Sequence, residues 1–119
     1  MKASLTNYRQ SPRKIRLIAG AVKGKSVTVA DAILAHMPKR GAEPMQKLLK
    51  SAVANAVSTG ADVATLVVEN MTVNKGLVMK RFMPRAMGVA KPIRHRTSHV
   101  AVTLATKAPK APKVTAKKK

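Results

Sequence analysis

The chain of 119 residues carries 24 Lys and Arg against four Asp and Glu, which gives a formal net charge of +20 at pH 7. This length favours a single domain with a modest core, and the uncompensated charge indicates a polyanionic partner. The absence of cysteine excludes disulfides and thiolate metal sites, and no apolar run approaches the ~20 residues that a membrane-spanning helix needs.

The basic residues are concentrated outside the middle of the sequence. Residues 1–25 hold seven Lys and Arg, residues 75–99 seven and residues 107–119 six, whereas residues 26–74 hold four together with all four acids. We therefore expect a neutral scaffold that carries three basic limbs. The start, MKASLTNYRQ, lacks the apolar centre of a secretory signal, so a cytoplasmic chain is expected.

The first two expected elements are a strand and a basic helix. Residues 2–9 alternate loosely and favour a short strand. A helix follows, with Ser11 as N-cap, Pro12 at its first position and Gly24 as its stop. Its cations have no acid nearby, and two interpretations stay open: a solvated helix face or a set of phosphate contacts. These cations are Arg13, Lys14, Arg16, Lys23 and Lys25.

Two more helices are expected in the neutral section. The segment TVADAILAHM predicts a short helix with Thr28 as its cap, Asp31 as the acid of a capping box and Pro38 as its end. From Pro44 to about Thr59 apolar residues recur at helical spacing and predict the core helix. The expected core positions are Met45, Leu48, Leu49, Ala52, Val53, Ala56 and Val57.

After Gly60 the pattern changes to β-structure. ATLVVENMTV is rich in β-branched residues, and SHVAVTLAT places Val100, Val102 and Leu104 on one face. The two dozen residues between these strands predict an extended hairpin arm, over about 75–98, with its tip near AMGVAK. Such an arm has no core of its own and needs a surface to lie against.

Residues 105–119 are low-complexity Ala, Pro and Lys, and we expect a disordered basic tail there. The domain itself is expected over 1–104, with the globular part in 1–74 and 97–104.

Chemistry typical of enzymes is absent from the sequence. No Gly-rich phosphate loop, nucleophile elbow or paired acid motif occurs, and Asp31 and Glu43 have structural explanations. His95 and His99 stand four apart, but the segment favours a strand and no third ligand is near, so no metal site is expected. We expect these imidazoles to be hydrogen-bonding or stacking groups beside RNA. The chain is predicted not to be an enzyme and to need no cofactor.

Three stretches resemble the bacterial large-subunit ribosomal protein 22 family. They are SPRKIRLIAGAVKGKSV with ADAIL, then KLLKSAVANA, then MKRFMPRAMGVAKPIRHRTSHVAV, in the family's order and at its separations. The third is the most specific, because MKR.MPRA.G followed by RTSH is not a generic basic pattern. The resemblance covers nearly all of residues 5–104.

The resemblance implies an α+β fold: a small three-stranded antiparallel sheet packed with three helices, plus a long protruding β-hairpin. It implies a structural constituent of the large ribosomal subunit that binds its ribosomal RNA and supports assembly. The hairpin tip would line the polypeptide exit tunnel, with the segment from Met79 to Lys91 nearest the tunnel. Relatives usually carry basic residues at the positions of Met87 and Val89, so this tip departs from the family's electrostatics.

Arginine, which binds phosphate in a bidentate manner and stacks on bases, supplies four of the seven cations in residues 75–99. Charge and resemblance together give a set of expected RNA-binding residues: Tyr8, Arg9, Arg13, Lys14, Arg16, Lys23, Lys25, Lys80, Arg81, Arg85, Arg94, His95, Arg96, Thr97, Ser98 and His99. The expected tunnel-lining residues are Met83, Pro84, Arg85, Ala86, Met87, Gly88, Val89, Ala90 and Lys91.

The expected partners are large-subunit ribosomal RNA, neighbouring ribosomal proteins and the nascent polypeptide, with no membrane and no homo-oligomer. The alternative is a histone-like architectural DNA-binding protein, which also combines helices with a basic β-arm. Against it, such proteins dimerise through a helical body, and this sequence shows no extra apolar face for that purpose. The expected location is the bacterial-type ribosome in the cytoplasm.

Overall fold

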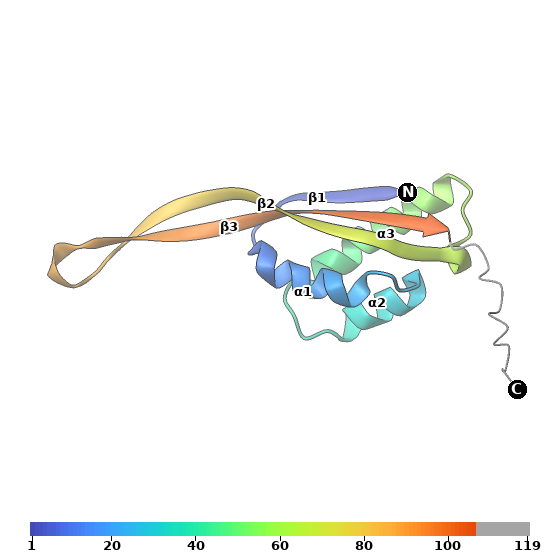
Figure 1. Cartoon of the computed structure of the whole chain (residues 1–119), viewed down its shortest axis with the longest axis horizontal. Helices are drawn as coiled ribbons and strands as arrows, with labels where there is room; N and C mark the ends of the chain where they lie inside the picture. Colours follow the sequence, from blue (N-terminus) through green and yellow to red (C-terminus); the bar gives the residue numbers. More distant parts are fainter. Residues whose placement is uncertain (107–119) are drawn as a thin grey trace, which may run out of the picture.

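The computed structural model describes residues 1–106, which form three helices and a three-stranded antiparallel sheet (Figure 1). The predicted α+β class is confirmed. In chain order the elements are β1 (Lys2–Tyr8), α1 (Pro12–Val22), α2 (Val27–His36), α3 (Ala42–Ser58), the 3-10 turn η1 (Val63–Thr65), β2 (Leu66–Pro84), the 3-10 turn η2 (Ala86–Gly88) and β3 (Ala90–Thr106).

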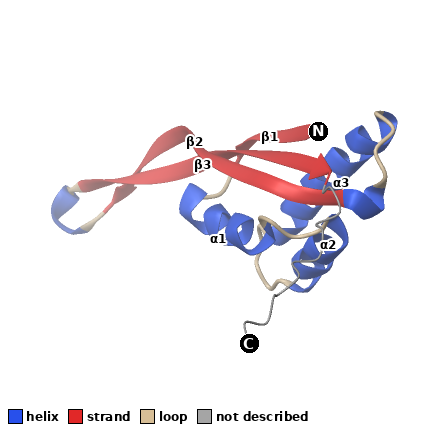
Figure 2. Ribbon diagram, turned by 45° about the vertical axis from the view of Figure 1, so that its right-hand side comes forward, coloured by secondary structure: helices blue, strands red, loops and turns tan. Residues whose placement is uncertain are grey.

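The sheet has the order β1-β3-β2, so β3 is its central strand. In the body of the protein β1 pairs with the last part of β3, from Lys2 opposite Thr103 to Tyr8 opposite Ser98. Strand β2 pairs with β3 over almost its whole length, from Leu66 opposite Thr106 to Pro84 opposite Ala90. The helices lie together on one side of the sheet (Figure 2).

The core lies between the sheet and the helices, where each element buries one face. Alternate residues of β2 and β3 point inward, as the period of two in the strands predicts. The aliphatic side chains of α1 and α3 at helical spacing cover them. The buried apolar residues of β2, β3 and the three helices include Ile15, Ile18, Val22, Leu34, Met45, Leu49, Ala52, Leu66, Val68, Val100, Val102 and Leu104.

Helix α1 begins and ends as its sequence predicts. Ser11 precedes it in an extended conformation, and Pro12 occupies the first turn, where no N–H is needed. Gly24 has a φ of 78°, which suits glycine, and its N–H donates to the Val68 carbonyl at 2.8 Å. The turn after α1 is thereby attached to β2.

The predicted cap of α2 is wrong. The helix begins at Val27, one residue before Thr28, because the Val27 side chain is buried in the core while Thr28 is exposed. Ser26 precedes the helix, without a capping hydrogen bond from its side chain. Asp31 does not form a capping box either, since its Oδ1 accepts a hydrogen bond from Gln46 Nε2 on α3 at 2.9 Å. This bond joins the two helices.

Helix α3 ends at Ser58, just before the predicted stop at Gly60, but its start and one of its core positions differ from the prediction. It begins at Ala42, two residues before Pro44, and Ala42 is buried against the core. At the other end Val57, which the periodicity assigned to the core, is 52% exposed. In this last turn Ala56, which is completely buried, is the residue that packs in the core.

The predicted hairpin arm is present as the outer halves of β2 and β3, which leave the body together and are joined at the tip by η2 (Figure 1). The radius of gyration is 19.5 Å, against ~13 Å expected for a compact domain of ~100 residues, because of this arm.

Ala105 and Thr106, assigned to the tail by the prediction, belong to β3. The rest of the predicted tail, 107–119, lies outside the described residues.

Candidate nucleic-acid interface

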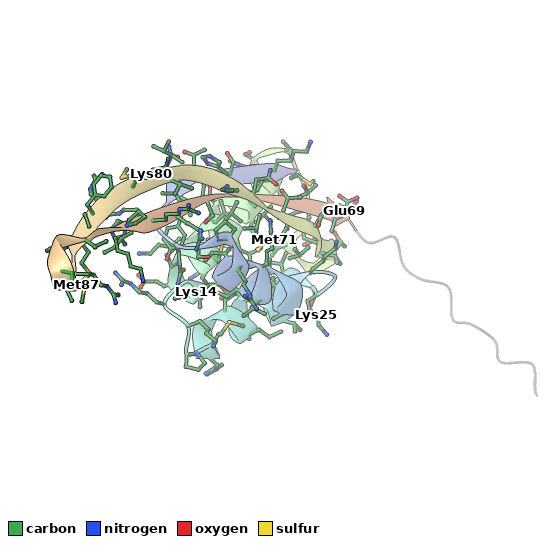
Figure 3. All side chains as sticks on the ribbon, turned by 60° about the vertical axis from the view of Figure 1, so that its left-hand side comes forward. Lys14, Lys25, Glu69, Met71, Lys80 and Met87 are labelled. Carbon is green, nitrogen blue, oxygen red and sulfur yellow. The ribbon has the colours of Figure 1, made fainter. Side chains whose placement is uncertain are left out.

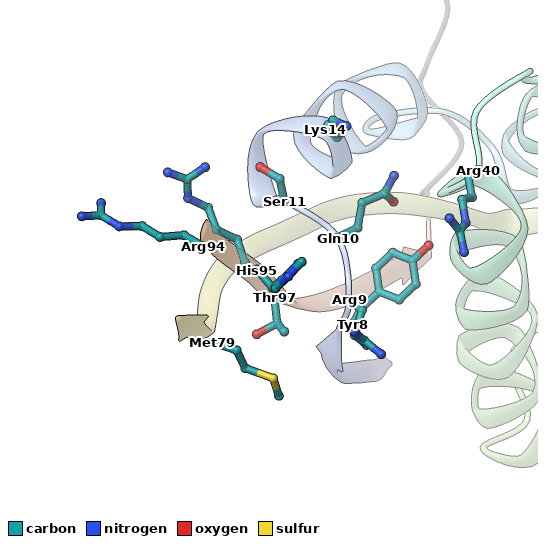
Figure 4. A pocket seen from close by; sticks show the side chains of 11 residues that line it. Tyr8, Arg9, Gln10, Ser11, Lys14, Arg40, Met79, Arg94, His95 and Thr97 are labelled. Carbon is teal, nitrogen blue, oxygen red and sulfur yellow. The ribbon is translucent and has the colours of Figure 1, made fainter. Parts of the chain in front are cut away.

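A cleft of about 530 Å³ lies where the arm joins the body. Its walls come from the end of β1, the first turn of α1, the loop before α3 and the base of the arm (Figure 4). The lining residues are Tyr8, Arg9, Gln10, Ser11, Lys14, Arg40, Met79, Arg94, His95, Arg96 and Thr97. Seven of the predicted RNA-binding residues are thus brought together from distant parts of the sequence.

The cleft is lined by cations without a single carboxylate. Arg9, Lys14, Arg40, Arg94 and Arg96 are all exposed, and no acid of residues 1–106 lies within ion-pair distance of any of them. A concave surface lined by one sign of charge concentrates its field and attracts the opposite charge. The geometry therefore suits a polyanion that reaches into the junction.

The single ion pair found within residues 1–106 lies on α3, away from the cleft. Lys47 Nζ donates to Glu43 Oε1 at 2.8 Å, and this hydrogen bond and the attraction of the ammonium lower the pKa of Glu43. The neutral section of the chain thus neutralises part of its own charge locally, while the basic limbs do not.

The N-terminus of α1 adds a partial positive charge to the cleft. The Ser11 side chain makes no capping hydrogen bond, and the first turn contains Arg13 and Lys14 but no acid. Cations in a first turn oppose the helix dipole, whereas an anion there is favoured by both the dipole and the free N–H groups. An anionic partner would relieve this unfavourable arrangement.

Arg40 reaches the cleft because Gly41 lets its loop pack closely on α1. A Cβ at Gly41 would lie 2.7 Å from Gln10 Oε1 and 2.8 Å from the Cδ1 atoms of Ile15 and Ile18. Arg40 was missed by the sequence analysis, because it lies in the section without net charge. Only the tertiary approach of this loop, which no local pattern signals, places it among the other cations.

A second hollow, of about 360 Å³, continues the basic surface on another side of α1. Arg13, Arg16, Lys75 and Arg96 line it together with Ser11 and Pro12, so Arg96 borders both cavities. Arg16 also donates from Nη2 to the Val73 carbonyl at 3.2 Å, which attaches α1 to β2. Lys75, which belongs to the basic limb of residues 75–99, was not among the expected RNA-binding residues.

Lys23 and Lys25, also predicted to bind RNA, lie apart from the cleft. They follow the last turn of α1, whereas Lys14 is in its first turn, and Figure 3 shows Lys14 and Lys25 at separate places along the body. Both are exposed. The basic limb of residues 1–25 therefore forms two surfaces.

At one place along the arm, two cations face each other across the strands. Lys80 pairs with Arg94, so their side chains leave the same face of the hairpin. Figure 3 shows that Lys80 lies on the side of the arm that faces away from the helices. Like charges directly opposite each other destabilise a sheet. Arg81, opposite Ile93, points to the other face. Both faces of the arm therefore present exposed cations.

The tip of the arm is a tight, exposed turn closed by a hydrogen bond from Arg85 N to Val89 O at 2.9 Å. Met87 and Gly88 both have positive φ, 61° and 69°. Met87 is 99% exposed and lies at the end of the arm (Figure 3). The predicted tunnel-lining residues 83–91 are together at this tip and all are exposed.

The predicted RNA-binding motif RTSH, residues 96–99, is only partly on the surface. Thr97 is 4% exposed, and its Oγ1 donates to the Leu77 carbonyl at 2.7 Å, while Ser98 is completely buried. His99 Nδ1 accepts a hydrogen bond from the backbone N–H of Asn7 at 3.1 Å. The Thr97 and Ser98 side chains thus pack inside the protein, although Thr97 also borders the cleft, and their contact with RNA stays a prediction.

Thr97 and His99 hold two irregularities in the neighbouring strands. Gly76 and Leu77 of β2 both lie opposite Thr97, and Thr6 and Asn7 of β1 fall opposite His99. Such bulges bend a strand and increase its twist. The motif thus fixes the place where the arm leaves the body and orients the cleft walls.

A family model described as ribosomal protein L22p/L17e matches residues 3–105. The chain belongs to the ribosomal protein L22p/L17e family. It is 51% identical over 106 residues to the large ribosomal subunit protein uL22 of Geobacter sulfurreducens, covering 88% of this chain and 96% of that protein. It is 50% identical over 106 residues to the protein of the same name from an Anaeromyxobacter species, covering 87% and 74%.

Membership of the L22p/L17e family confirms the resemblance that the three sequence stretches indicated. It also confirms that the chain is a ribosomal protein and not an enzyme. Within residues 1–106 no group of three or more His, Asp or Glu is placed to hold a metal ion. No helix of the described part is long and apolar enough to cross a membrane.

Proposed function

We propose that the chain is a structural constituent of the large ribosomal subunit that binds large-subunit ribosomal RNA through the junction cleft and the arm. The two relatives named above are large-subunit proteins of bacteria, and a bacterial-type protein of this family is bound to ribosomes in the cytoplasm. The observation that carries the proposal is the cleft lined by Arg9, Lys14, Arg40, Arg94 and Arg96 with no carboxylate.

RNA is the polyanion that fits the arm as well as the cleft. Cations leave both faces of the hairpin, so phosphates must approach from more than one side. Folded RNA offers several strands around an inserted segment, whereas a DNA duplex offers one surface. Neutralising phosphates releases counterions, and this release drives binding that weakens as salt increases. Membership of a ribosomal-protein family disfavours the alternative, a histone-like DNA-binding protein.

We further propose that the tip of the arm lines the polypeptide exit tunnel and meets the nascent chain. Two observations support this proposal: the tip lies far from the body, and it carries the exposed apolar residues Met83, Met87 and Val89. Such side chains would contact a passing peptide without binding it through charge. In this arrangement the body lies against ribosomal RNA and neighbouring ribosomal proteins, supports subunit assembly and stays a monomer.

A binding experiment with matched variants tests the RNA proposal. The full chain is titrated with transcribed large-subunit ribosomal RNA and with duplex DNA over a range of salt concentrations. We expect tighter binding to the RNA, and we expect Arg94→Gln with Arg96→Gln to reduce the log–log salt slope by about 2, since each phosphate contact contributes ~0.9. The control, Lys47→Gln with Lys50→Gln on α3, should leave the slope unchanged. Equal or tighter binding to the DNA would refute the proposal.

A further inference from the structure

The arm carries an aromatic side chain that the rest of the described chain leaves uncovered. Phe82 is 76% exposed, whereas the only other aromatic residue, Tyr8, is half-buried at the cleft. Burying a phenylalanine from water is worth roughly 1.5–3 kcal/mol, so leaving one open on a solvated hairpin forgoes that stabilisation. A ring in this position is free to pack against the surface of a binding partner.

The register of the hairpin fixes which residues lie beside Phe82. Pro92 lies directly opposite it on β3, so the two rings leave the same face of the hairpin. Two residues toward the body, the same face carries the cross-strand pair of Lys80 and Arg94. These positions are ~6.6 Å from Phe82 along the strand, because each residue advances the chain by ~3.3 Å. One face of the arm thus places a flat apolar surface beside two cations.

This combination fits a nucleic-acid base with its phosphate. A base stacks on an aromatic face in a way that tolerates any sequence, while the adjoining backbone needs positive charge. An apolar protein partner would cover Phe82, but it would leave Lys80 and Arg94 facing each other without an anion. The positions flanking Phe82 therefore favour RNA over an apolar protein surface.

We propose that Phe82, backed by Pro92, is a stacking site for one unpaired RNA base whose neighbouring phosphates contact Lys80 and Arg94. This inference rests on the proposed RNA-binding function of the arm and adds the kind of RNA that the arm selects. Paired bases are already stacked on their neighbours and cannot offer a free face. The arm consequently prefers an RNA segment with an extruded or single-stranded nucleotide.

The test compares two oligomers of equal charge with the full chain at 150 mM salt. One is single-stranded oligoadenylate of eight nucleotides, and the other is an abasic ribose-phosphate oligomer of the same length. We expect Phe82→Leu to weaken binding of the oligoadenylate about tenfold and to leave binding of the abasic oligomer unchanged. Leu77→Ala, which removes an apolar side chain that is 64% exposed on the same arm, should change neither.

A second readout reports on the ring directly. The sequence contains no tryptophan, so Phe82→Trp places a single indole at the site. Its fluorescence should be quenched by the oligoadenylate but not by the abasic oligomer, and this variant should keep the affinity of the unaltered chain. An unchanged affinity in Phe82→Leu, an equal loss on both oligomers or an unquenched indole would overturn the stacking site. Failure of the unaltered chain to bind either oligomer would overturn the RNA-binding function itself.

Discussion

At the scale of residues, the segment 96–99 combines surface charge with a structural role. Arg96 borders both basic hollows, while Thr97 and His99 hold the bulges of β2 and β1 through single hydrogen bonds. Gly76 is required at the first bulge, because a Cβ there would lie 2.5 Å from Thr97 Oγ1 and 3.1 Å from His99 Nε2. The junction is therefore closely packed although it lies near the surface.

We predict that Gly76→Ala destabilises the protein by about 1–3 kcal/mol, since the added methyl group must displace Thr97 and weaken its bond to the Leu77 carbonyl. Thermal unfolding of the full chain measures this as a lower Tm. The control is Gly20→Ala in α1, where a Cβ would meet nothing within 4 Å. That change should stabilise the helix by roughly 0.5–1 kcal/mol. Equal Tm values for the two variants would contradict the packing described for the bulge.

At the scale of elements, the arm and the body have different sources of stability. The body buries aliphatic residues of all three helices between them and the sheet, whereas residues 79–96 of the arm are exposed throughout. An isolated two-stranded hairpin is marginal in water. We therefore propose that the arm depends on a partner along its length and that the body folds without the arm.

Replacing residues 79–95 by an Asn-Gly turn tests this division. Val78 and Arg96 are paired, so a two-residue turn can join them in the existing register. We expect cooperative unfolding with a Tm within a few degrees of that of the full chain. We also expect the salt slope of RNA binding to decrease by about 4, because five cations are removed. A variant that no longer unfolds cooperatively would show that arm and body are one folding unit.

The elements were largely predictable because they follow from local patterns. Helical spacing in residues 44–59 and alternation in 98–106 gave the core, and the length between the two strand signals gave the arm. The cap at Thr28 and the burial of Val57 were predicted wrongly, since tertiary packing buries the adjacent residues, Val27 and Ala56, instead. The RNA-binding site was predicted as a set of residues, mostly cations, without their arrangement in space. Arg40, the burial of Thr97 and the setting of Phe82 required the register and the tertiary packing.

At the scale of the whole molecule, nearly every basic side chain of residues 1–106 lacks an acidic partner. Apart from Lys47, no Lys or Arg of residues 1–106 takes part in an ion pair, and all of them are exposed. Mutual repulsion of these cations costs stability in the free protein. A polyanion bound to the folded form removes that repulsion and stabilises the fold by mass action.

The most direct test of the central claim, that the arm runs through ribosomal RNA with its tip at the nascent chain, is a photo-cross-linking map. A photoreactive phenylalanine derivative replaces Arg94, Met87 or Val57 in turn, in ribosomes that hold a stalled nascent chain and are purified at high salt. We expect cross-links from position 94 to large-subunit RNA, from position 87 to the nascent chain, and from position 57 to RNA or protein outside the tunnel. Absence of the protein from large subunits, or nascent-chain cross-links from position 57 and not from position 87, would contradict it.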